Sequence, residues 1–349
     1  MNTKKESFVK RLFEKQETSI ILILLAMILI FYLAVPAFLS PANIYSVLKT
    51  LSFYGIVAVG ETLIILAGDI DISVGSTAGL AAVLGTKLMM DWKCFGLLDT
   101  PYEWIGVIAI MLLTMILLSS IGFINAFFVV KVNIPPFVAT IATLNIARGL
   151  VNIITNGVPV YPLPSFFMDK MGQFQIYLSK EGGLSLSLIV FLILCLIVSW
   201  LLKHSTWGRN LYATGNNKEV AKLMGINTDR IRFISYVVTA MLAALAGMLV
   251  AAFTKQGYPP IGQGWELQVI AACVIGGLSL TGGSGSILGM FCGMCIMNVL
   301  VTGLAMIGFN TFLQTSAQGF IILVAVYIDR LRYSRKIKND NPDEAGTKA

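Results

Sequence analysis

Three carboxylates lie close together where two apolar stretches of the chain meet. Glu61, Asp69 and Asp71 belong to the segment 60–76, which contains no Lys or Arg. An acid at the centre of a bilayer costs about 2.5–3.5 kcal/mol on insertion scales, so such residues usually face a wet cavity or a partner. We therefore predict that these acids line a polar path through a membrane. For Asp69 and Asp71 the alternative is a solvated turn that caps the next helix through Ser73.

Other polar residues lie inside or beside apolar stretches. Arg148 stands eleven residues into one of them, three residues after Asn145. Its guanidinium either extends to the membrane surface or lines a cavity, where it meets a carboxylate or a polar ligand. Glu266 opens an apolar stretch after a segment rich in Pro and Gly, and the outer membrane edge is the simpler position for it. The candidate pathway residues are therefore Glu61, Asp69, Asp71, Asn145, Arg148 and Glu266.

The composition indicates that membrane helices must hold these residues. Of the 349 residues, 56% are hydrophobic and only 12% are charged, which is about half the charged fraction of a soluble domain. Several apolar runs are long enough to cross a bilayer as helices. We predict an all-α, polytopic membrane protein with about ten transmembrane helices, at residues 20–38, 51–67, 74–90, 104–130, 137–155, 184–202, 233–253, 266–281, 286–307 and 312–328.

The distribution of Lys and Arg predicts the orientation of these helices. Basic residues gather in the segment 1–19, in the loop 203–232 and after the last span. Because cytoplasmic segments carry the excess of Lys and Arg, we predict cytoplasmic termini on either side of a transmembrane domain at 20–330. The tail 331–349 is polar after Arg335 and is predicted to be disordered there. Topology then explains the net charge of +7, and no nucleic-acid partner is needed.

Weak internal patterns suggest how the helices are packed. The stretch from Gly122 to Pro136 loosely resembles the stretch from Asn298 to Phe312, and the predicted topology runs the two in opposite directions. An inverted repeat would require this, although a chance match is the alternative. Small residues spaced four apart predict close helix contacts, at Gly75 and Gly79, Ala243 and Gly247, and Gly289 and Gly293.

The loop 203–232 contains a short amphipathic helix. It carries six Lys or Arg residues and two acids. Asn216 or Asn217 can cap the start of this helix, and Gly225 suits the position after its end. Its apolar residues share one face, which either docks on another protein or packs on the membrane domain of the same chain. The residues assigned to docking are Lys218, Glu219, Val220, Ala221, Leu223, Met224 and Gly225.

The sequence lacks the residues that common enzyme chemistries need. No phosphate-binding G-x-x-x-x-G-K-[ST] motif occurs, so no ATP site is predicted in this chain. His204 is the only histidine, and neither a catalytic triad nor a metal site can be assembled around it. Cys292 and Cys295 are interpreted as small buried apolar residues. The chain is therefore predicted not to be an enzyme and to hold no cofactor of its own.

Taken together, four stretches resemble the permease subunits of bacterial ATP-binding-cassette sugar importers, in the branch of the ribose, galactose and xylose permeases. These stretches are 60–76, 134–150, 210–232 and 265–289. The family's docking loop carries Glu-Ala-Ala, three residues and Gly, and this chain matches it at Glu219, Ala221 and Gly225, with Val220 replacing the first Ala. The family's motif Gly-Gly-Ile-Asp-Leu-Ser-Val-Gly corresponds to residues 68–75, where Asp69 replaces the second Gly.

The resemblance implies a permease of the bacterial inner membrane that works with several partners. These are a separate ATPase subunit that binds ATP and Mg, an extracytoplasmic sugar-binding protein, a second permease copy or paralogue, and membrane lipid. The implied substrate is a monosaccharide such as a ribose-like pentose, moved when the helix at 216–225 follows the ATPase. A proton-driven secondary transporter, with Glu61, Asp69 and Asp71 as its relay, is one alternative. A channel or a structural membrane scaffold is another.

Overall fold

The fold is a bundle of long helices, as the apolar runs predict. The computed structural model describes residues 16–180 and 182–340; most of the predicted segment 1–19 and residues 341–349 of the predicted tail lie outside this part. The helices of the first half are α2 (Gln16–Ala34), η1 (Pro36–Leu39), α3 (Pro41–Leu66), α4 (Val74–Asp91), α5 (Lys93–Gly96), α6 (Glu103–Ala126), η2 (Phe127–Lys131), α7 (Pro136–Thr155) and η3 (Phe167–Gly172).

A small hairpin separates the two halves of the bundle. Strands β1 (Gln175–Ser179) and β2 (Gly182–Ser185) pair in antiparallel fashion. The second half contains α8 (Leu186–His204), α9 (Thr206–Asn216), α10 (Lys218–Leu223), α11 (Thr228–Thr254), α12 (Trp265–Ile275), α13 (Ile287–Ile307) and α14 (Thr311–Asp340). The prediction of an all-α chain is therefore wrong at the hairpin, where two glycines at the start of β2 favour a tight turn.

Each of the ten predicted stretches coincides with a helix, but the helices differ in length and polarity. Six of them are long and apolar enough to cross a membrane: α3, α6 with η2, α7, α8, α11 and α13. The apolar parts of α2, α12 and α14 are shorter, and α4 is not among the six. The structure thus establishes a polytopic helical protein, and the number of ten spans stays a prediction.

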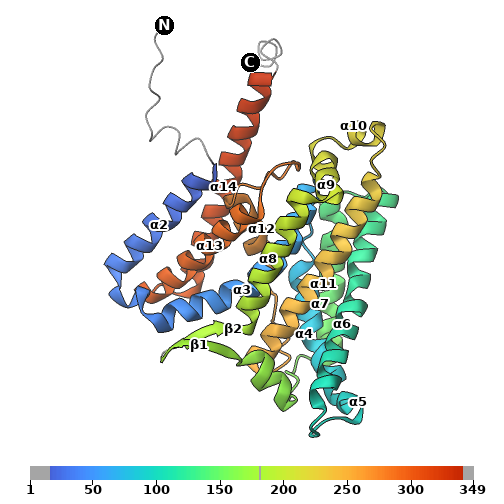
Figure 1. The fold of residues 1–349 in the computed structure, drawn as a ribbon, viewed down its shortest axis with the longest axis vertical. Helices are drawn as coiled ribbons and strands as arrows, with labels where there is room; N and C mark the ends of the chain where they lie inside the picture. The colour runs from blue at the N-terminus through green and yellow to red at the C-terminus, as the bar shows by residue number, and fades with distance from the viewer. Residues whose placement is uncertain (1–15, 181, 341–349) are drawn as a thin grey trace.

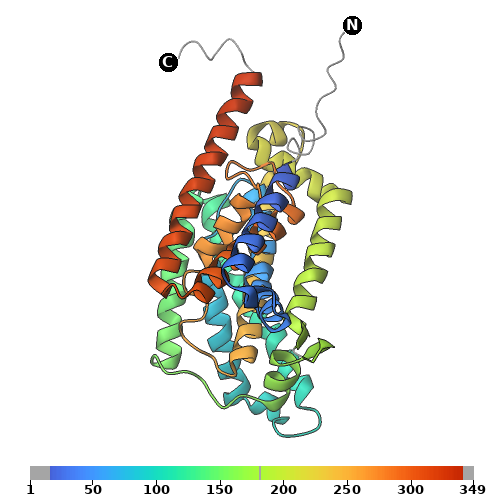
Figure 2. The ribbon, with the colours of Figure 1, turned by 90° about the vertical axis from the view of Figure 1, so that its left-hand side faces the viewer.

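The ends of several helices meet at one end of the molecule. The first turn of α2, the helices α9 and α10, and the last turns of α14 lie together there, whereas the hairpin and α5 lie at the opposite end (Figures 1 and 2). The predicted orientation places these segments on one side of the membrane, and their cytoplasmic location stays a prediction. Helix α14 continues to Asp340, so the prediction of disorder after Arg335 is wrong for residues 336–340. No Gly or Pro lies between Arg335 and Pro342 to end the helix earlier.

Helix α11 forms the centre of the bundle and packs against α3, α4 and α6. Gly247 of α11 lies so close to α4 that an added Cβ atom would overlap the Ala78 carbonyl group. The predicted helix contact is also confirmed for α13, because a Cβ atom at Gly293 would overlap the Ala272 carbonyl oxygen of α12. Gly75 and Gly79 of α4 instead approach the carbonyl oxygens of Gly262 and Ile261, in the loop between α11 and α12. Close backbone approach is how helices pack without a hydrophobic driving force between them.

Candidate functional site: a buried polar cluster and an exposed amphipathic helix

The loop between α3 and α4 folds back along α3. Gly68 allows the turn, because its φ of +82° is in the left-handed region. The backbone N–H of Asp71 then donates to Oε1 of Glu61 at 3.1 Å. Glu61 lies five residues before the end of α3, about 7.5 Å along the helix axis, so α4 begins well inside the bundle. Asp69 and Asp71 are 2% and 1% exposed, and the alternative of a solvated turn is wrong.

Asp71 and Ser73 connect this loop to two further helices. Oδ1 of Asp71 accepts hydrogen bonds from the Ser73 backbone N–H at 2.7 Å and from the Ser73 hydroxyl at 2.6 Å. The Asn125 amide of α6 donates to Ser73 Oγ at 2.9 Å, and Thr143 of α7 donates to Asn125 Oδ1 at 2.7 Å. Burial raises the pKa of Asp71, and the bonds from Ser73 partly oppose that effect. Ser73 does not cap α4 with its side chain.

Two buried polar atoms at this cluster have no partner within the described part of the chain. They are Oε2 of Glu61 and the hydroxyl of Tyr236 in α11. Leaving a buried polar group unsatisfied costs about 1–3 kcal/mol. Such atoms are frequent where a ligand, a proton or a water binds in another state. The cluster can therefore offer hydrogen bonds to a polar ligand or accept a proton.

Asp69 does not share in this cluster, because two basic residues bind it. Arg232 of α11 donates from Nε to Oδ2 at 2.7 Å and from Nη2 to Oδ1 at 3.0 Å. Lys218, the first residue of α10, contacts Oδ1 at 3.0 Å. The segment around Asp69 thus contains no basic residue of its own, and both basic partners of Asp69 come from a part of the chain about 150 residues later. Sequence reasoning missed Arg232 as a site residue, since its charge was explained by topology alone.

The other predicted pathway residues lie around α4 and α7. Arg148 donates from Nη1 to the carbonyl oxygens of Ile261 at 2.8 Å and Pro259 at 3.3 Å. Its Nη2 and the Oε2 of Glu266 are buried without partners in the described structure. Both side chains flank the glycine face of α4: added Cβ atoms at Gly75 and Gly79 would meet Glu266 and Arg148, respectively. Asn145 is exposed and donates only to the Ile141 carbonyl of its own helix.

The short helix α10 has the predicted caps and an exposed apolar face. Asn217 accepts hydrogen bonds from the backbone of Glu219 at 3.0 Å and Val220 at 3.1 Å. Gly225 follows the end of the helix with a φ of +81°. Leu223 and Met224 are 88% and 76% exposed, and Val220 is 50% exposed, so the alternative that this face packs on its own chain is wrong. Ala221 is the exception among the assigned docking residues, since it is buried.

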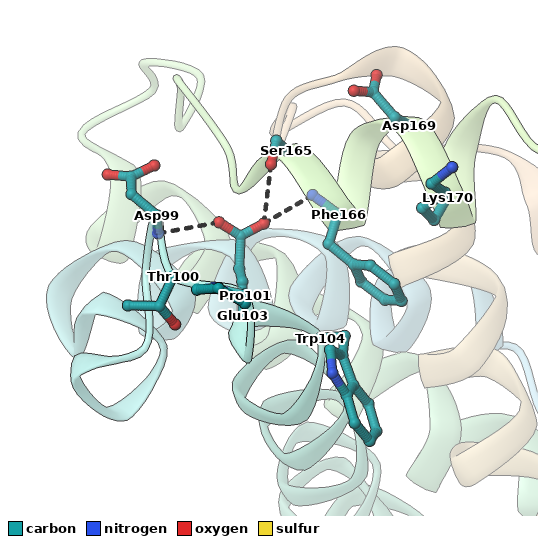
Figure 3. Close-up of a pocket in the computed structure, with 9 residues that line it drawn as sticks. All are labelled: Asp99, Thr100, Pro101, Glu103, Trp104, Ser165, Phe166, Asp169 and Lys170. Carbon is teal, nitrogen blue, oxygen red and sulfur yellow. Dashed lines mark hydrogen bonds between the residues drawn. The ribbon is translucent and has the colours of Figure 1, made fainter.

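A cavity of about 430 Å³ lies at the opposite end of the molecule, between α6 and the segment before the hairpin. Figure 3 shows that the Glu103 carboxylate is hydrogen-bonded to residues on both sides of this cavity. The carboxylate accepts hydrogen bonds from the backbone N–H groups of Phe166 at 2.7 Å and Asp99 at 3.1 Å, and from the Ser165 hydroxyl at 3.2 Å. Because these donors engage both oxygens, Glu103 joins three segments and is interpreted as structural.

The fold and these residues define a polytopic membrane protein with a buried polar centre and one exposed amphipathic helix. Residues 43–327 match the family described as "Branched-chain amino acid transport system / permease component". The chain belongs to this permease family and is a multi-pass protein of the bacterial inner membrane.

Curated relatives of the chain are import permeases. The ribose import permease of Bacillus subtilis is 32% identical over 84% of this chain and 87% of its own length. The autoinducer 2 import system permease of Photorhabdus luminescens is 35% identical over 79% of this chain and 78% of its own. The galactose/methyl galactoside import permease of Escherichia coli is 31% identical, covering 95% and 98%. No solved structure matches the chain.

Proposed function

We propose that this chain is the membrane permease of an ATP-binding-cassette importer that carries a monosaccharide or a related polyhydroxylated ligand. Relatives that cover most of the chain import ribose, galactose or autoinducer 2. The observation that carries the proposal is the exposed apolar face of α10, at the end of the molecule where α2 begins and α14 ends (Figure 1). An apolar face on a short helix in water gains stability only by docking. A separate ATPase subunit is its proposed partner.

A photo-cross-linking experiment tests this docking. A cross-linking amino acid at Leu223 or Met224 in α10 is expected to capture the ATPase subunit when the two proteins are produced together. The same group at Leu178 in β1 is the matched control, because that side chain is 64% exposed at the opposite end. Ala221 is unsuitable, since it is only 2% exposed. Transport that continues while neither α10 position captures an ATPase would refute the proposed function.

The pathway of the ligand is proposed to pass the unsatisfied polar groups. Sugar hydroxyls lose hydrogen bonds to water when they enter a membrane, and each loss is costly unless a new partner replaces the water. Glu61 and Glu266 offer acceptors and Arg148 offers a donor, and all three have a buried atom without a partner in the described structure. Asp71 and exposed Asn145 complete this proposed set. Asp69 is left out, because basic groups bind both of its oxygens.

Uptake assays separate this function from the proton-driven alternative. Cells that lack their own sugar importers would produce the chain with its ATPase and its extracytoplasmic binding protein. Radiolabelled ribose, galactose and autoinducer 2 would then be offered in turn. Uptake should stop when ATP is depleted and should fall on substitution of Arg148 by Met. Uptake that persists in energised vesicles without ATP would instead favour a proton-coupled transporter.

The exposed face of α7 supports a second permease in the complex. Asn145 and Asn152 are seven residues apart on this face, and both are exposed on a helix long enough to cross a membrane. Polar side chains are costly against lipid and usually face protein or a water-filled cavity. Cysteines at position 152 of two copies should therefore form a disulfide in membranes if the second permease is identical. No cross-link would indicate a paralogue or another interface.

A further inference from the structure

Asp69 occupies a place where the resembled family has glycine, and the structure shows what the added carboxylate does. It binds a residue of α10, which is the proposed docking helix, and a residue of α11. We infer that Asp69 is a positioning residue that ties α10 to the loop between α3 and α4, so that movement of α10 displaces the buried polar cluster. This inference rests on the proposed function, because it takes α10 as the helix that the ATPase moves.

Asp69, Arg232 and Lys218 form an ion-pair group with a well-defined geometry. Three nitrogen atoms lie between 2.7 and 3.0 Å from the two oxygens of Asp69. The side chain of Asp69 is 1% exposed and that of Arg232 is 10% exposed, so water does not replace these contacts easily. Charge-assisted bonds with two points of attachment also fix orientation. Lys218, with 36% of its side chain exposed, is the more easily displaced partner.

The backbone next to Asp69 joins the end of α3 to α9 and to the segment at Gly283. The N–H group of Gly283 donates to the carbonyl oxygen of Leu66, the last residue of α3, at 3.0 Å. Gly215, near the end of α9, lies so close to Leu66 that an added Cβ atom would overlap its carbonyl group. These contacts hold the end of α9 against α3, but they do not involve α10. Among the described contacts, the Lys218–Asp69 pair supplies the link from the loop to α10 itself.

The other side of the loop leads directly to the cluster. Two residues after Asp69, the Asp71 backbone N–H donates to Glu61, and its carboxylate binds Ser73. From there hydrogen bonds reach Asn125 in α6 and Thr143 in α7. A displacement of the loop must therefore strain or break contacts in α3, α4, α6 and α7. Coupling between distant sites needs such an element with more than one arrangement, and the loop at 67–73 is our candidate.

Nucleotide-dependent thiol labelling of the assembled transporter tests this inference. The reporter is a cysteine in place of Ile70, a half-buried residue between Asp69 and Asp71 in the loop itself, and the parent chain measures labelling of the native cysteines, four of which are buried. The complex with its ATPase is purified, and labelling by a maleimide is timed with ADP and then with ATP and vanadate. Asp69→Asn should reduce the nucleotide-dependent change in rate about fivefold or more. Lys218→Gln should reduce it about twofold.

The control is Lys131→Gln, which removes the exposed pair between Lys131 and Asp229 at 3.4 Å and should leave the nucleotide response unchanged. A full response in Asp69→Asn overturns the inference and leaves the proposed function standing. If the reporter chain without further substitution assembles no ATPase, or if its labelling ignores nucleotide, the result counts against the proposed function itself. If the Asp69→Asn chain does not assemble, the Lys218→Gln chain tests the inference by itself, since it keeps the buried Arg232–Asp69 pair. An unchanged nucleotide response in Lys218→Gln then overturns the inference that Asp69 links the loop to α10.

Discussion

The ion pair between Asp69 and Arg232 makes a prediction about stability that is separate from transport. Asp69→Asn removes the negative charge but keeps the size of the side chain. Arg232, which is only 8% exposed, then keeps a buried positive charge without an anion. Breaking a buried pair in this way costs about 3–5 kcal/mol. Lys218 contributes less than about 1 kcal/mol of this, because its side chain is partly exposed to solvent.

A double-mutant cycle isolates the interaction. Arg232→Met alone should cost about 2–3 kcal/mol, less than Asp69→Asn, because Lys218 still faces the orphaned carboxylate. Together the two substitutions leave no buried charge at this place and should cost far less than the sum of the single effects, with a coupling of about 3 kcal/mol. Unfolding of the purified chain in mixed detergent micelles, titrated with SDS, measures the three free energies. Single costs that simply add would refute the reasoning.

Three further predictions concern packing and hydrogen bonding. Glu103→Gln should destabilise the chain by about 1–3 kcal/mol, since the new amide group faces a hydrogen-bond donor. Thermal unfolding measures this loss. As the control, Asp169→Asn at an exposed position of the same cavity should change stability by less than about 0.5 kcal/mol. Gly247→Ala should cost about 1–3 kcal/mol through overlap with α4, whereas Gly149→Ala, where the added atom meets nothing within 4 Å, should be tolerated in the same unfolding assay. Tyr212→Phe removes a hydrogen bond of 2.9 Å to the Gly285 carbonyl and should cost about 1 kcal/mol; an unchanged melting temperature would show that this bond does not hold α9.

Features that depend on neighbours in the sequence could be predicted. The apolar runs located every long helix, and Asn217 and Gly225 defined the ends of α10, because caps act within a few residues. The helix α9 was missed, although Ser205 accepts a hydrogen bond from the Gly208 backbone at 2.9 Å and caps it. The length of α12 was overestimated, since it ends at Ile275 before two glycines.

Features that depend on distant parts of the chain could not be predicted. The partners of Asp69 lie 149 and 163 residues away, and no local pattern specifies such a pair. The same holds for Asn125, which the sequence marks only as a polar residue in an apolar helix. A residue of this kind usually bonds to another helix, and here it bridges Ser73 and Thr143. Tyr236 gave no signal at all, because its unsatisfied hydroxyl is evident only from its burial.

The two ends of α4 differ in how strongly their contacts resist movement. At its start, Asp71 and Ser73 share short hydrogen bonds, two of them at 2.6 and 2.7 Å to one carboxylate oxygen. Bonds to a charged group contribute about 1.5–3 kcal/mol each. Further along, Gly75 and Gly79 pack on the backbone of Gly262 and Ile261 through van der Waals contacts, and Glu266 and Arg148 beside them each retain an unsatisfied atom. The same displacement therefore costs less at the glycine face than at the start of the helix. When the loop at 67–73 moves, the hydrogen-bonded group around Ser73 is expected to move with it as one unit, and the environment of Arg148 and Glu266 is expected to change most.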